Sequence, residues 1–341
     1  MFGVFWAIFA ALPASADTLR LAVLQSGLSR DGPGLLLRDI RASAADVLAV
    51  RDLVATAQPD VLLLLRFDYD LDGLTLEAFA SLLEVGGHAM SHRFALRPNS
   101  GQATGLDMDG DGRLGTSDDA QGYGRFAGQG GMAILSRLPF DHSGVQDHSQ
   151  FLWQDLPGAL IPEVDDAPFP SAEVFAIQRL SSTGHWQVPV ITPSGTTLTL
   201  LTWHAGPPAF GGPHERNRRR NHDETAFWLH LLDGRLPSPP PGQPLVLMGN
   251  ANLDPAAGDG MQAAIRSLLA HPALQDPEPM GQRPGTDQPG TETAYWPRGP
   301  GALRVSYILP SVGLDIRDSG VIWPAEGAGN HALVWVDIAL P

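Results

Sequence analysis

Short apolar runs alternate with longer amphipathic stretches along most of the chain, and this alternation limits the folds that the sequence can adopt. Apolar runs bounded by Gly, Pro and polar residues are typical of buried strands, whereas an apolar period of 3.6 residues is typical of helices. The pattern predicts helices at 44–57 and 216–232, and strands at 19–24, 61–65, 132–136, 197–203, 245–248, 304–309 and 332–338. Strands mixed with helices over this length favour a layered α/β fold.

The first residues have the composition of an export signal. Residues 2–12 are apolar, and the small residues Ala14, Ser15 and Ala16 follow before Asp17. We therefore expect residues 1–16 to be a signal peptide and residues 17–341 to be one domain of a secreted or periplasmic protein. A buried amino-terminal strand or helix is the alternative, because no Lys or Arg precedes the apolar run. Neither this run nor any later one is long enough to cross a bilayer, so we expect no membrane span.

The composition narrows the classes of partner and of metal site. The chain has 37 acidic residues against 22 basic ones, all of them Arg, and its net charge is −15. Such a surface repels polyanions, so duplex nucleic acid is not expected as a partner. The chain has no Cys, which excludes disulfides and thiolate metal sites. Nothing in the sequence predicts an oligomeric state.

One segment matches the template of a calcium-binding loop. Residues 107–118 read DMDGDGRLGTSD, with acids at the first, third and fifth positions and Gly at the sixth. The predicted ligands are the carboxylates of Asp107, Asp109, Asp111 and Asp118 and the backbone carbonyl of Arg113, and Leu114 is expected to pack inward. Asp118 replaces the Glu of the template, which weakens the site or requires Asp119 as a further ligand. A bound calcium ion would have a structural role, and the alternative is a solvated Asp/Gly turn.

A cluster of arginines begins the predicted helix at 216–232. Arg216, Arg218, Arg219 and Arg220 could form a nucleic-acid patch, but three acids lie within one or two helical turns of them, Glu215, Asp223 and Glu224. We interpret the cluster as a charge network at the start of the helix.

Six segments, in this order, carry a family resemblance. They are 59–70 (PDVLLLLRFDYD), 124–139 (GRFAGQGGMAILSRLP), 203–223 (WHAGPPAFGGPHERNRRRNHD), 249–255 (GNANLDP), 304–311 (RVSYILPS) and 329–336 (GNHALVWV). Together they resemble the endonuclease/exonuclease/phosphatase family, whose relatives include pancreatic deoxyribonuclease, sphingomyelinases and inositol polyphosphate phosphatases. The resemblance implies a four-layer α/β sandwich of two mixed sheets flanked by helices, with a site at the strand ends. It also implies metal-assisted attack of water on phosphorus, with the cation held by Glu, Asp and Asn oxygens.

The chain departs from the family pattern at the positions that hold the metal. By resemblance His204, Asn252 and His331 are retained, whereas Gln25 replaces Asn, Arg66 replaces Glu, and Asn250, Ser306 and Asn330 each replace Asp. Four of these five changes remove a carboxylate, and one adds a positive charge. A unit charge about 4 Å away contributes roughly 4 kcal/mol at an effective dielectric constant near 20. We therefore expect no catalytic magnesium or manganese at these positions.

Three hypotheses for the function remain. In the first, which we prefer, the chain is catalytically impaired and binds a phosphate-containing small molecule or another anion with Arg66, His204, His331, Asn250 and Asn252. In the second, it is an active metal-dependent phosphodiesterase or phosphatase with a non-standard metal site, in which Asp254 or Asp223 replaces a lost acid. In the third, Arg66 pairs with an acid such as Asp68, and the protein acts through another surface.

Overall fold

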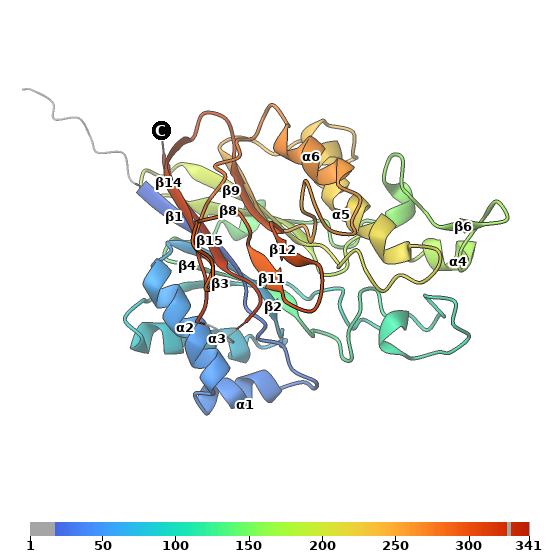
Figure 1. The fold of residues 1–341 in the computed structure, drawn as a ribbon, viewed down its shortest axis with the longest axis horizontal. Coiled ribbons are helices and arrows are strands. Elements are labelled where there is room, and N and C mark those ends of the chain that lie inside the picture. Colours follow the sequence, from blue (N-terminus) through green and yellow to red (C-terminus); the bar gives the residue numbers. More distant parts are fainter. Residues whose placement is uncertain (1–17, 326–328, 341) are drawn as a thin grey trace, which may run out of the picture.

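Two mixed sheets form the middle of the computed structural model, which describes residues 18–325 and 329–340 (Figure 1). The six-stranded sheet has the order β14-β15-β1-β2-β4-β3. Its strands are β1 (Thr18–Gln25), β2 (Val61–Phe67), β3 (His92–Phe94), β4 (Gly131–Ser136), β14 (Asp315–Ile322) and β15 (Leu333–Ala339). The predicted signal peptide, residues 1–16, lies outside the described residues.

The five-stranded sheet repeats the pairing pattern of the first. Its order is β13-β10-β9-β8-β5, with β5 (Gln146–Asp147), β8 (His185–Ile191), β9 (Thr197–His204), β10 (Leu245–Asn250) and β13 (Ser306–Pro310). In each sheet one central pair is parallel, β1 with β2 and β9 with β10, and the other pairs are antiparallel. Both sheets are therefore mixed, as the resemblance implied.

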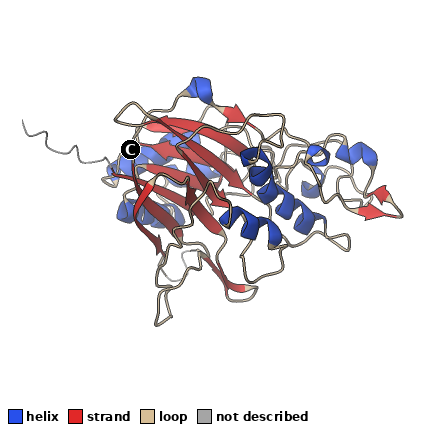
Figure 2. Cartoon of the chain, turned by 90° about the horizontal axis from the view of Figure 1, so that it is seen from above, coloured by secondary structure: helices blue, strands red, loops and turns tan. Residues whose placement is uncertain are grey.

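Helices cover the outer face of each sheet, which makes four layers (Figures 1 and 2). Helices α1 (Leu35–Arg41), α2 (Ala45–Ala57) and α3 (Leu74–Val85) pack on the six-stranded sheet, and α5 (Arg216–Leu232) and α6 (Ala263–Leu269) pack on the five-stranded sheet. The short helix α4 (Ala172–Phe175) and the hairpin β6 (Glu163–Val164)–β7 (Ala167–Pro168) lie to one side of the sheets (Figure 2). A second hairpin joins β11 (Ala294–Trp296) to β12 (Gly301–Leu303).

The continuous apolar runs in the sequence result from burial on both faces of the central strands. On β2, Val61, Leu63 and Leu65 pack between the sheets, whereas Leu62 and Leu64 face helices α2 and α3. A strand with both faces covered has no polar side to alternate with, so its sequence reads as an unbroken apolar run. The seven predicted strands lie within about two residues of their observed limits, and α5 spans the predicted 216–232. The strands β8 and β14 were not predicted.

The apolar face of α5 packs on the five-stranded sheet. Phe227, Trp228 and Leu231 are buried against Leu201 and Trp203 of the five-stranded sheet. No helix in the described ranges is both long enough and apolar enough to cross a membrane.

Candidate functional site

The positions that the sequence singled out meet at one edge of the two sheets. Gln25 is the last residue of β1, His204 the last of β9 and Asn250 the last of β10. Parallel strands end at the edge where their antiparallel neighbours begin, so Asn250 lies between His204 and Ser306, the first residue of β13. His331 reaches the same edge shortly before β15. We call Gln25, His204, Asn250, Asn252 and His331 the strand-end cluster.

A chain of hydrogen bonds joins the two sheets through this cluster. The backbone N–H of Asn252 donates to Asn250 Oδ1 over 2.6 Å, the Asn250 amide donates to Gln25 Oε1, and Gln25 Nε2 lies 2.9 Å from His331 Nε2. A backbone N–H can only donate, so it fixes the orientation of the Asn250 amide, which in turn fixes that of Gln25. Gln25 therefore donates to His331, and the ring accepts through Nε2 as a neutral imidazole with its proton on Nδ1.

Burial keeps both histidines of the cluster uncharged at neutral pH. Burial, and then the nearby charges of Arg66 and His331, lower the pKa of His204 to about 3. Burial, and then the charge of Arg66, lowers the pKa of His331 to about 4. Within the described part of the chain, no carboxylate forms a hydrogen bond or ion pair with either ring that would offset the cost of charging it.

Two buried polar groups beside the cluster have no partner among the described residues. His331 Nδ1 and Ser306 Oγ are both buried and form no hydrogen bond with the residues that the structure describes. Thr293 brings their backbones together, because its hydroxyl accepts from the Ser306 N–H over 3.0 Å and its carbonyl from the Ala332 N–H over 2.9 Å. The shorter Ser side chain thus removes the acceptor that the family resemblance places beside a histidine.

The β11–β12 hairpin holds the other side of the His331 ring. The rings of Trp296 and His331 meet edge to face, with centroids 5.2 Å apart and planes at 86°. The Tyr295 N–H donates to the backbone carbonyl of Asn330 over 2.8 Å, which fixes the hairpin to the segment that carries His331. Asn330 itself is exposed and joins this arrangement through its backbone.

Arg66 is exposed at a bulge near the end of β2. Its φ is 53°, and the register with β4 shifts between Leu65 and Phe67. The left-handed conformation costs a non-Gly residue about 1–2 kcal/mol, and bulges often redirect a side chain toward a site. Asp68, the partner considered for Arg66, is buried and instead accepts the N–H groups of Arg30 and Gly130, each over 2.8 Å. Arg66 forms no ion pair with any residue in the described ranges.

The strand-end cluster does not fit a divalent cation. Hard cations in proteins require several oxygen ligands, usually with at least one carboxylate. Here the amide oxygens of Gln25 and Asn250 already accept hydrogen bonds, and the charge of Arg66 lowers the pKa of both histidines of the cluster. A neutral cluster with a guanidinium beside it suits an anion.

The sequence as a whole matches the Endonuclease/Exonuclease/phosphatase family over residues 25–335. The chain belongs to this family. The matched region begins at Gln25 and includes every residue of the strand-end cluster. No curated protein matches the chain.

Solved structures of the family share the fold at low sequence identity. An endonuclease/exonuclease/phosphatase from Beutenbergia cavernae aligns with a TM-score of 0.58 and 16% identity over 95% of this chain and 72% of that one. The human Nocturnin catalytic domain with bound sulfate anion aligns with a TM-score of 0.53 and 13% identity, over 95% of this chain and 94% of that one. A family protein from Leptotrichia buccalis aligns with a TM-score of 0.52 and 14% identity, over 94% of this chain and 100% of that one. These similarities establish the four-layer sandwich as the family fold.

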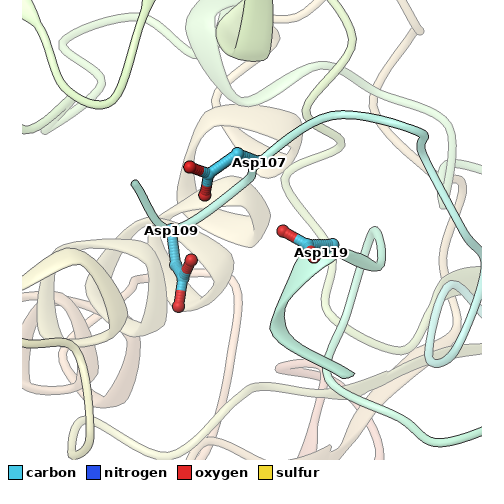
Figure 3. Close-up of side chains that lie close together, drawn as sticks. All are labelled: Asp107, Asp109 and Asp119. Atoms are coloured by element: carbon cyan, nitrogen blue, oxygen red, sulfur yellow. The ribbon is translucent and has the colours of Figure 1, made fainter. Parts of the chain in front are cut away.

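A second group of candidate ligands lies in the long loop between β3 and β4. Carboxylate oxygens of Asp107, Asp109 and Asp119 lie within 4.8 Å of one another, a grouping that could hold a metal ion (Figure 3). Asp119, rather than the predicted Asp118, completes the group because a 3₁₀ turn at Ser117–Asp119 directs it inward. There its carboxylate accepts the N–H groups of Met108 and Thr116 over 2.9 and 2.8 Å. Asp118 remains exposed.

The rest of this loop differs from the calcium-loop template. Asp111 accepts the Arg113 N–H over 2.7 Å and does not join the three carboxylates. Leu114 is 69% exposed, so the expectation that it packs inward is wrong. Among the residues that the structure describes, no pair of helices flanks the loop. Arg216 is buried at the start of α5, and burial lowers the pKa of its guanidinium. The charges of Asp109, Asp118 and Asp119 offset part of this lowering, so these carboxylates lie near Arg216. The loop therefore already faces one cationic side chain.

The arginines of α5 serve the structure of this region. Arg218 pairs with Glu215 over 2.5 Å, as the predicted helix-start network requires. Arg220 is buried and donates to the carbonyls of Gln121, Leu180 and Ser181, which ties two loops to the helix. These contacts do not form an exposed nucleic-acid patch.

Sequence reasoning did not identify two residues that shape the site. Nothing in the sequence marks Trp296 or Thr293 as part of a site. Both precede β13 by about ten residues, on a hairpin whose docking against His331 depends on long-range pairing. The sequence contains no local signal for that docking.

Proposed function

We propose that this family member binds a small anion, in particular a phosphate group of a small molecule, at the strand-end cluster, and that its metal-dependent catalysis is impaired. The observation that carries the proposal is the hydrogen-bond chain from Asn252 to His331. Its members are neutral amides and a neutral imidazole, whereas a site for a divalent cation needs carboxylates. Arg66, exposed and without an acidic partner in the described ranges, supplies the positive charge. A guanidinium recognises phosphate oxygens with paired hydrogen bonds.

Two further observations support this proposal. The charge of Arg66 lowers the pKa of both His204 and His331, so the guanidinium lies near both rings. The human Nocturnin catalytic domain, which shares the fold, was solved with a bound sulfate anion. The hypothesis that Arg66 is neutralised by Asp68 has no support, because the Asp68 carboxylate is occupied by backbone N–H groups.

Thermal unfolding in the presence of anions tests the binding part of the proposal. We expect inorganic phosphate to raise the melting temperature of the mature protein in EDTA, because a ligand that binds only the folded state stabilises it. Arg66→Ala should abolish this rise. Arg41→Ala, which removes an exposed arginine at the end of α1, is the matched control and should leave it intact. No rise with phosphate or sulfate in the native chain would sink the proposal.

Hydrolysis of bis-p-nitrophenyl phosphate tests the catalytic part. We expect no turnover with magnesium, manganese or calcium, because the cluster lacks the carboxylates that would hold the cation. Turnover that disappears in His204→Ala would instead establish an active phosphodiesterase with a non-standard metal site.

For the carboxylate group in the β3–β4 loop, we propose calcium as the cation and a structural role. The support is the convergence of Asp107, Asp109 and Asp119 on one side of the loop. Calcium should raise the melting temperature, and Asp109→Asn should remove that rise while leaving the phosphate effect unchanged. A calcium effect that survives in Asp109→Asn would show that the ion binds elsewhere.

We also propose that the protein is exported, to the periplasm or the medium, on the basis of the apolar run at residues 2–12. Amino-terminal sequencing of the mature protein should begin at Asp17. A chain recovered from the cytoplasm with Met1 in place would contradict this proposal.

A further inference from the structure

A pocket of about 240 Å³ lies at the edge of the six-stranded sheet, between the β2–α3 loop and β3. It forms because β3 pairs with β4 only as far as Phe94, which lies opposite Ile134, whereas β4 begins at Gly131. The outer edge of β4 at Met132 and Ala133 therefore faces the pocket and not another strand. No residue of the strand-end cluster lines this pocket, so it is separate from the proposed anion site.

The floor of the pocket is apolar and belongs to the core. Phe67, Phe94 and Met132 line it, and all three are buried. The Phe67 ring packs on Phe79 of α3, with ring centroids 5.7 Å apart, so the floor is fixed in place. A dry cavity of roughly 150 Å³ can hold benzene. The pocket therefore has room for a phenyl-sized group that carries a short polar chain.

Carboxylates line the pocket on the side of α3. They belong to Asp70, Asp72 and Glu77, and Arg93 of β3 is the single base of the lining. Asp72 and Glu77 are exposed, and neither forms an ion pair with any residue in the described ranges. A fourth acid of the lining, Asp68, is buried and already accepts two backbone N–H groups. Negative charge therefore dominates the opening of the pocket.

Hydrogen bonds hold the loop that carries these acids. The Tyr69 N–H donates to the Gly128 carbonyl over 2.8 Å, and the Asp70 carboxylate accepts the N–H groups of Leu74 and Thr75 over 2.9 and 2.8 Å. Burial alone would raise the pKa of Asp70, but the hydrogen bonds from Thr75 and Leu74 outweigh it and lower the pKa, so this group is charged at neutral pH. A ligand would therefore find the acidic side of the pocket already ordered.

We infer that this pocket binds a small organic cation, an amine or amidine that carries a compact apolar group. The apolar group packs on Phe67, Phe94 and Met132, and the cationic head lies near the carboxylates of Asp72 and Glu77. Hydrogen bonds from a cation to a carboxylate are about twice as strong as those between neutral groups. A bare metal ion would leave the apolar floor in contact with water, whereas an organic cation covers it. The inference is independent of the proposed anion site.

Titration calorimetry of phenethylamine and of its neutral analogue 2-phenylethanol, with the mature protein at pH 7, tests the inference. The amine should bind at least about tenfold more tightly than the alcohol, a difference of about 1.4 kcal/mol. Added salt should weaken binding of the amine and leave that of the alcohol unchanged. The double variant Asp72→Asn, Glu77→Gln should remove the advantage of the amine. Glu84→Gln, at an exposed acid of α3 that does not line the pocket, is the matched control and should preserve it.

Nuclear Overhauser effects from the phenyl protons to methionine methyl groups locate the bound amine. They should connect the ring to the methyl group of Met132, whose signal is assigned with Met132→Leu. Equal affinities for amine and alcohol, an advantage that survives in the double variant, or contacts to a different methionine would each overturn the inference. Absence of binding by both compounds would overturn it as well. In every case the result with phosphate decides the anion site separately.

Discussion

Replacing Asn250 with Asp should reverse the hydrogen bonds that join the sheets at the strand ends. In the native chain Asn250 donates to Gln25, which donates to His331. An aspartate at position 250 can still accept from the Asn252 N–H but can no longer donate. The Gln25 amide group must then flip, so that Nε2 donates to the new carboxylate and Oε1 faces His331. We therefore expect Asn250→Asp to move the imidazole proton of His331 from Nδ1 to Nε2.

The new charge should also make His331 more basic. Two hydrogen bonds and the Gln25 amide separate the two side chains, so the charges lie roughly 7 Å apart, and their attraction is about 2.4 kcal/mol at a dielectric constant near 20. That energy corresponds to a rise of about 1.7 in the pKa of His331, which burial and Arg66 hold at about 4 in the native protein. Position 250 is fully buried, which raises the pKa of the new carboxyl group and makes this rise an upper limit.

Long-range ¹H–¹⁵N NMR of the imidazole nitrogens, followed through a pH titration, measures both effects. His331→Gln assigns the signal. Asn330→Asp is the matched control, because it adds a carboxylate next to His331 in sequence but at an exposed residue outside the hydrogen-bond chain. The control should leave the proton on Nδ1. If His331 keeps its Nδ1 proton and its pKa in Asn250→Asp, the donor and acceptor roles assigned to Asn250, Gln25 and His331 are wrong.

Two predictions concern stability. Between pH 6.5 and about 4, His204 binds a proton in the unfolded chain but not in the folded one, so stability falls as the pH falls. In His204→Gln the free energy of unfolding should therefore decline less steeply with falling pH, by about 1.4 kcal/mol per pH unit. Urea unfolding at stepped pH measures this slope, and an unchanged slope would contradict the burial of a neutral ring. Arg220→Leu should cost about 3–5 kcal/mol in the same assay at pH 7, because it leaves four carbonyls, that of Arg179 included, and the Glu224 carboxylate without the buried guanidinium. Arg218→Leu, which breaks an exposed pair with Glu215, should cost less than about 1 kcal/mol, and equal losses would refute the distinction.

The layers of the fold were predictable because local pattern and tertiary burial agree. The apolar run at 61–65 is a strand with both faces covered, and α5 follows the period of Phe227, Trp228 and Leu231. The positions of Gln25, His204, Asn250 and Ser306 in the fold were predictable because each begins or ends a strand, or lies within two residues of a predicted strand end.

The connections between these residues were not predictable from the sequence. Gln25 and His331 are 306 residues apart, and their hydrogen bond depends on the antiparallel pairing of β1 with β15 in the six-stranded sheet. The positive φ of Arg66 depends on a register shift against β4, and the choice of Asp119 over Asp118 depends on a single 3₁₀ turn. Each of these features is set by pairing between distant segments or by one backbone angle, which composition and periodicity do not encode.

The central claim is that the strand-end cluster binds an anion directly and needs no divalent cation to do so. Titration calorimetry of inorganic phosphate, first in EDTA and then with excess magnesium or manganese, tests this claim most directly. The structure predicts the same dissociation constant in both conditions and loss of binding in Arg66→Ala. Phosphate binding that appears only with the metal, and that survives in Arg66→Ala, would contradict it.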